Sequence, residues 1–167
     1  MKNSFTLIEI LVYILVLSIV SGALVTATLR LVEFYNITRF NREVLINAHS
    51  GLDNILSEIR YSSDIYTPTS SANQISLETN LNPPSGETKT YVDFYLDNGR
   101  LCIKREEQDP QPLTSEKVEV NNLSFNYLSS LADPSSIKIE MTVRYRSLKE
   151  KYQREVKLSS TGTLRGY

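Results

Sequence analysis

Cysteine and histidine are almost missing from this chain. Its 167 residues contain one cysteine, Cys102, and one histidine, His49. A single cysteine excludes a disulfide within the chain, and the two residues cannot supply the four ligands of a structural zinc site. The net charge is −1, so no overall field draws the chain toward nucleic acid or anionic lipid.

Motifs for catalysis and cofactor binding are missing as well. The chain contains no G-x-x-x-x-G-K-[ST], G-x-G-x-x-G, G-x-S-x-G or H-E-x-x-H sequence. We therefore expect no enzyme and no bound cofactor or metal. With 41% hydrophobic and 22% charged residues, the composition suits one modest globular domain beside an N-terminal segment.

The N-terminal segment is a candidate membrane-spanning helix. Residues 10–29, ILVYILVLSIVSGALVTATL, carry no charged side chain. As a helix they would span roughly 30 Å, the thickness of the hydrocarbon core of a bilayer. The run is longer than the apolar part of a cleavable secretory signal, so we expect it to stay in the protein. Lys2 ahead of the run favours a cytoplasmic N-terminus, whereas Arg30 behind it argues slightly the other way.

A carboxylate stands near the start of this apolar run. Glu9 ends the stretch SFTLIE, and a charge at such a depth costs up to about 3 kcal/mol to insert. The stretch SFTLIEILV resembles the processing motif of type IV prepilins and type II secretion pseudopilins. That motif joins a short basic leader, the sequence Gly-Phe-Thr-Leu-Ile-Glu and a long apolar run.

The resemblance implies that a prepilin peptidase removes the leader, residues 1–4, by cutting between Ser4 and Phe5. The same enzyme would methylate the new amino terminus on Phe5. Glu9 would then stand five residues into the mature chain, where the family has its glutamate. Ser4 departs from the family pattern, which has glycine there, and this puts the rate of cleavage in doubt.

Two roles are open for Glu9. In the first, the carboxylate offsets the positive amino group of Phe5 and the positive end of the helix dipole, within its own chain or in a neighbouring subunit. Such pairing would also fix the stagger between subunits during assembly. In the second, Glu9 lies in the headgroup layer of a simple signal anchor. The residues FTLI directly before Glu9 favour the first role.

A helical pattern continues beyond the apolar run. Apolar residues recur at steps of three and four on one face, and His49 borders them as an edge residue. They are Ile37, Phe40, Val44, Leu45, Ala48, Leu52, Ile55, Leu56 and Ile59. We predict one helix from residue 5 to about residue 62. Its membrane and filament-core part covers 5–32, and its amphipathic continuation covers 33–66.

The remaining part, residues 67–167, has the period of β-strands. Asn98-Gly99 separates TYVDFYL from RLCIKR and predicts a two-residue hairpin turn. The register pairs Phe94 with Ile103 on one face and Tyr95 with Cys102 on the other. Cys102 is therefore expected on the outer face, as a structural thiol beside Tyr95 rather than a reactive one.

Loops are expected at 80–89, 106–117 and 129–136. The predicted fold class is α+β, with the long helix packed on an antiparallel sheet, as the resemblance to pilins also implies.

The function implied by the resemblance is structural. The strand order and the tail STGTLRGY resemble those of the J-type minor pseudopilins and W-type minor pilins. We expect a minor subunit that assembles or initiates a type IV pilus-like or type II secretion filament. It would cross the cytoplasmic (inner) membrane once, with its globular domain outside. Its partners would be prepilin peptidase, other pilin or pseudopilin subunits, the inner-membrane assembly platform and the lipid bilayer.

Two alternatives remain open. One is a simple membrane-anchored binding domain. The other is a DNA-binding minor pilin of a competence pilus, because basic residues with interleaved tyrosines could bind phosphates. The basic residues are Arg144, Arg146, Lys149, Lys151, Arg154 and Lys157. A solvated hairpin face explains the same residues, so nucleic acid is not the favoured partner.

Overall fold

The computed structural model describes residues 6–130, 133–149 and 152–165. These residues form two compact units, divided between Arg39 and Phe40. The first unit is helical. The second unit contains the rest of the same helix together with strands β1 to β8.

Helix α1, Leu7–Tyr61, runs without interruption and confirms the predicted long helix. It begins after Thr6, whose carbonyl oxygen accepts hydrogen bonds from the backbone N–H groups of Glu9 (3.1 Å) and Ile10 (3.3 Å). The absence of proline from the whole segment lets every later N–H group join the helical ladder.

One face of α1 is buried in the second unit. Its buried residues are Val44, Ala48, Gly51, Leu52, Ile55, Leu56 and Ile59. The predicted apolar stripe is therefore confirmed, with one correction. Leu45 is 42% exposed, because it lies about 100° around the helix from Val44 and outside the packed face.

Strands β1 to β5 form an antiparallel sheet in which they lie in sequence order. Their bounds are Ser62–Ile65, Ile75–Thr79, Thr90–Asp97, Arg100–Arg105 and Gln111–Pro112. The two edge strands β1 and β5 were not predicted. Their sequences, SSDI and QP, are short and largely polar, and only pairing with β2 and β4 makes them strands.

The hairpin between β3 and β4 has the predicted register. Phe94 pairs with Ile103, and Tyr95 pairs with Cys102. At the turn, Asn98 has φ 49° and Gly99 has φ 73°. These two left-handed residues are what a two-residue hairpin turn with the right-handed twist of its strands requires.

The last three strands form a second antiparallel sheet, in the order β6-β7-β8. Their bounds are Val118–Ser130, Asp133–Tyr145 and Glu155–Thr163. The loop predicted over 129–136 is wrong for most of its length. Proline and serine in DPSS suggested a loop, but pairing continues from Leu128 with Ser136 to Ser130 with Asp133.

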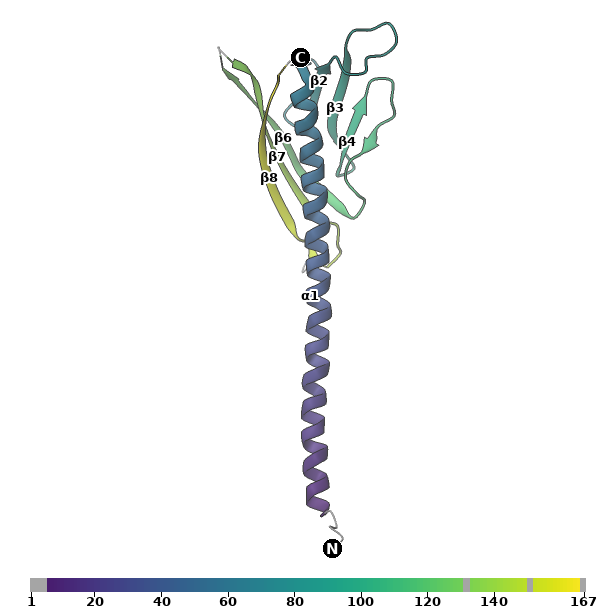
Figure 1. The fold of residues 1–167 in the computed structure, drawn as a ribbon, viewed down its shortest axis with the longest axis vertical. Helices are drawn as coiled ribbons and strands as arrows, with labels where there is room; N and C mark the ends of the chain where they lie inside the picture. The colour runs from purple at the N-terminus through teal and green to yellow at the C-terminus, as the bar shows by residue number, and fades with distance from the viewer. Residues whose placement is uncertain (1–5, 131–132, 150–151, 166–167) are drawn as a thin grey trace. The chain divides into compact units, whose positions relative to one another are not determined.

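The α+β fold class is confirmed, although the single predicted sheet is divided into two. The backbone N–H of Val120 in β6 donates to the carbonyl of Gly99 (2.8 Å), which joins the two sheets at the β3–β4 turn. In Figure 1 the labelled strands β2 to β4 and β6 to β8 lie on either side of the second half of α1.

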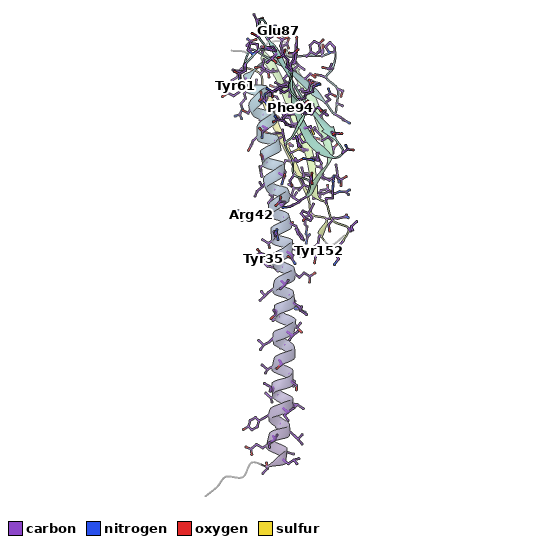
Figure 2. All side chains as sticks on the ribbon, turned by 90° about the vertical axis from the view of Figure 1, so that its right-hand side faces the viewer. Tyr35, Arg42, Tyr61, Glu87, Phe94 and Tyr152 are labelled. Carbon is purple, nitrogen blue, oxygen red and sulfur yellow. The ribbon has the colours of Figure 1, made fainter. Side chains whose placement is uncertain are left out.

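The helix and both sheets share one hydrophobic core. Ile55 and Ile59 of α1, Phe94 of β3 and Ile139 of β7 are completely buried in the same cluster. Figure 2 shows Phe94 beside the helix. The backbone of the segment before β6 is also fixed to α1, because the Ser115 N–H donates to the Asn47 side-chain oxygen (2.7 Å).

Candidate functional site

The first unit presents an apolar helical surface. Its large apolar side chains from Leu7 to Tyr35 are exposed, from 48% at Val20 to 77% at Leu7. Among the described residues, α1 is a helix that is both long enough and apolar enough to cross a membrane. Apolar surface on this scale calls for lipid or for other apolar helices as its surroundings.

Three hydroxyl groups in the apolar run are satisfied within the helix. Ser18 Oγ donates to the Ile14 carbonyl (2.8 Å), and Thr26 Oγ1 donates to the Gly22 carbonyl (2.9 Å). Thr28 bonds to the carbonyl four residues before it in the same way. These three hydroxyl donors therefore need no water, which suits them to a bilayer or a helical bundle.

Glu9 lies in the first turn of α1 and is exposed. It follows Thr6 by three residues, the spacing of a capping box. A carboxylate at this end of a helix is stabilised by the positive end of the helix dipole. The predicted cleavage and methylation residues, Ser4 and Phe5, lie outside the described residues.

Two of the six basic residues proposed for DNA contact are engaged in ion pairs. Arg144 Nη2 of β7 lies 2.9 Å from Glu119 Oε2 of β6. Lys157 of β8 lies 3.7 Å from Glu155. These pairs across or along the sheet reduce the positive charge available on the strands.

The β7–β8 loop carries the other basic residues. Arg146, Lys149 and Arg154 are exposed. The Arg146 guanidinium also donates to the Asn98 carbonyl (3.2 Å). Lys151, the sixth basic residue, lies outside the described residues.

The tyrosines among these basic residues pack against α1. Phe40 stacks on Tyr145 with ring centroids 4.3 Å apart and an interplanar angle of 25°. It meets Tyr152 edge-on, with the centroids 5.2 Å apart. The aromatic rings therefore join the β7–β8 loop to the helix.

Cys102 pairs with Tyr95 on the face of β4 opposite Leu101 and Ile103, as predicted, but this face is covered and Cys102 is buried. The edge strand β5, which the sequence did not predict, pairs at this position through Pro112. Burial raises the pKa of the Cys102 thiol. Burial also raises the pKa of Tyr95, with the cysteine as a smaller cause. A buried thiol with a raised pKa is a structural residue.

A polar hollow of about 290 Å³ lies between α1, β2, β3 and β4. The ion pair between Arg105 and Glu58 lines it. It lacks the mainly apolar walls of small-molecule pockets. Within the described ranges, no cluster of three or more His, Cys, Asp or Glu side chains could hold a metal ion.

One exposed apolar residue was not predicted from the sequence. Leu148, between β7 and β8, has a relative exposure of 105%, so its whole side chain projects into solvent. A lone leucine inside the charged segment RSLKEK was the available signal.

Comparison with known proteins supports the N-terminal resemblance. Residues 1–25 match the family model described as the prokaryotic N-terminal methylation motif. No curated protein and no solved structure matches the chain. The match indicates a type IV prepilin-like protein, and together with the apolar helix it supports anchoring in a membrane. Such proteins are generally structural rather than enzymatic. They interact with other pilin subunits and with prepilin peptidase.

Proposed function

We propose that this protein is a minor pilin or pseudopilin, a structural subunit that assembles or initiates a type IV pilus-like or type II secretion filament. The observation that carries the proposal is the methylation motif directly followed by an uncharged, exposed helical surface. A folded unit of two sheets at the other end of the same helix is consistent with a subunit that contributes contacts outside the bilayer.

Processing and topology follow from the same proposal. Prepilin peptidase would cut between Ser4 and Phe5 and methylate Phe5. The mature chain would remain in the cytoplasmic (inner) membrane through α1, with its second unit outside. Lys2 supports a cytoplasmic N-terminus. The minor, J-type or W-type character rests on the strand order and on the lack of a second cysteine for a disulfide-closed loop.

Glu9 would serve assembly. Cleavage before Phe5 would create a positive amino group close to the first turn of α1, in which Glu9 lies. A carboxylate in that turn can offset the same charge on a neighbouring subunit during packing. Pairing in a low-dielectric environment favours the one stagger that brings both charges together.

The experiment compares Glu9→Leu with Glu9→Asp in cells that assemble the filament. We expect Glu9→Leu to insert in the membrane and to be cleaved, because insertion depends on apolar length. We expect it to be lost from sheared filaments and from crosslinked subunit complexes, since leucine cannot pair with a positive terminus. Glu9→Asp keeps the charge and should retain part of the assembly.

Membrane fractionation, the N-terminal mass and crosslinking separate the three steps. If Glu9→Leu joins its partners as well as the unaltered protein does, Glu9 is an ordinary interfacial residue. The assembly role of Glu9 is then wrong. If neither the unaltered protein nor either variant enters any subunit complex, the filament proposal itself is wrong.

A further inference from the structure

The loop between β7 and β8 combines full apolar exposure with positive charge. Leu148 projects entirely into solvent, and Arg146 and Lys149 on either side of it are exposed. The segment 146–154, RSLKEKYQR, contains four basic residues and one acidic residue, a net charge of +3 in a chain whose total is −1. We call the described residues of this segment, 146–149 and 152–154, the loop tip.

The loop tip is held in shape by hydrogen bonds. The Tyr145 N–H donates to the Arg154 carbonyl (2.9 Å) and closes the base of the loop. The Gln153 side-chain amide donates to the Ser147 carbonyl (2.9 Å) across it. The second of these bonds holds Ser147, the residue directly before the exposed Leu148.

Aromatic packing fixes the loop tip beside one position of α1. Phe40, the first residue of the second unit, stacks on Tyr145 and meets Tyr152 edge-on, at the two sides of the loop. Along the chain, Phe40 comes 11 residues after Leu29, where the uncharged run ends. Eleven helical residues cover about 16 Å, so the chain tethers Phe40 within about that length of the end of the run.

We propose that the loop tip is a peripheral membrane contact that binds anionic phospholipid. Leu148 enters the interfacial region of the bilayer, and Arg146 and Lys149 bind lipid phosphate groups. Basic residues near an anionic surface are attracted within a Debye length of about 8 Å, and a leucine between them adds apolar burial. The proposal requires membrane anchoring by α1 and is independent of filament assembly.

The structure favours lipid over nucleic acid at this loop. Stacking of bases on aromatic rings needs free ring faces. Here Tyr145 is stacked on Phe40, and Tyr152 meets the same ring. DNA phosphates also offer no partner for a fully exposed leucine, whereas the acyl chains of a bilayer do.

The test places an environment-sensitive fluorophore on the full-length protein in vesicles. The single cysteine is removed by Cys102→Ser, and Leu148→Cys then carries an apolar nitrobenzoxadiazole probe in place of the leucine. Glu87→Cys carries the control probe. Glu87 is exposed, and within the second unit it lies at the opposite end from Tyr152 (Figure 2). Vesicles contain phosphatidylcholine with brominated acyl chains, with or without phosphatidylglycerol.

We expect bromine to quench the probe at position 148 in vesicles with phosphatidylglycerol and to leave the probe at position 87 unchanged. Salt of about 1 M, where the Debye length is about 3 Å, should abolish the quenching. Lys149→Glu in the labelled protein should weaken it by more than fivefold, because each basic residue contributes about that factor. Lys104→Glu, the same charge reversal at an exposed lysine of β4, should have no effect.

Flotation of the vesicles reports anchoring by α1 separately from the contact at the loop tip. Equal quenching at positions 148 and 87 would overturn the proposal, as would quenching that is indifferent to anionic lipid and salt. The proposal would also be overturned if brominated lipid did not quench the probe at position 148 while a short DNA duplex changed the fluorescence of that probe. That last result would assign the loop tip to nucleic acid.

Discussion

Gly162 of β8 lies directly against Ile59 of α1. A Cβ atom added at Gly162 would stand 2.9 Å from Ile59 Cγ2 and 3.2 Å from Leu56 Cδ2. Ile59 is completely buried, and its branched side chain has little freedom to move aside. The absence of a side chain at Gly162 is therefore what lets the edge strand of the second sheet approach the helix.

Gly162→Ala should destabilise the second unit. Overpacking against Ile59 costs roughly 1–3 kcal/mol, which a gain in strand propensity of at most about 1 kcal/mol does not offset. Urea unfolding of residues 33–167 measures the change. Thr161→Ala, at the exposed neighbouring position, is the control and should cost less than about 1 kcal/mol. Equal effects of the two substitutions would contradict the close packing of β8 on α1.

Residues 33–167, separated from the apolar run, should be soluble and monomeric. The apolar face of α1 from Val44 to Ile59 is buried against both sheets, so removal of the membrane part leaves the core intact. Circular dichroism should show mixed helix and strand, and light scattering should give the mass of one chain. An insoluble fragment, or a nearly all-helical spectrum, would refute this arrangement.

Alkylation of Cys102 should be slow in the folded fragment. Burial raises the pKa of its thiol, so at pH 8 less thiolate is present than in an exposed cysteine, and access is also limited. The reaction with iodoacetamide should be at least about tenfold slower than in guanidinium chloride.

The raised pKa of Cys102 also sets a pH dependence of stability. Its contribution is present below the pKa of the unfolded thiol and is lost as the pH rises through the higher folded value. The raised pKa of Tyr95 likewise makes a contribution to stability that is lost as the pH rises, but at higher pH. Cys102→Ser should therefore flatten the fall of stability in the range where the unfolded thiol ionises.

In the alkylation experiment, a fast reaction of the folded protein with iodoacetamide would contradict a buried cysteine.

Binding of DNA by the fragment 33–167 is expected to be absent at physiological salt. Arg144 and Lys157 are already paired with Glu119 and Glu155. Fluorescence anisotropy of a labelled duplex at about 50 and 200 mM salt tests this, because phosphate binding weakens steeply over that range. Tight binding that falls with salt would favour the competence-pilus alternative.

The sequence predicted features that depend on local pattern. The length of α1 follows from its periodicity and its lack of proline. The β3–β4 register follows from Asn98-Gly99 and the alternation around it. Such features are set by residues close in the chain.

Features set by distant partners were not predictable. β1 and β5 are strands only because β2 and β4 pair with them. The division into two sheets depends on which strands pair, and Cys102 is buried where β5 pairs with β4. In the candidate site, Glu9 was found from its motif. The stacking of Phe40 on Tyr145 joins positions 105 residues apart and left no local signal.

The mass of the N-terminal peptide shows whether the chain is processed as a prepilin. The protein is extracted from membranes of cells with an active prepilin peptidase and digested, and the first peptide is weighed. We expect residues 1–4 to be gone and the peptide to begin at Phe5 with one added methyl group. An intact N-terminus that still carries Met1 would contradict the assignment to a processed prepilin-like filament subunit.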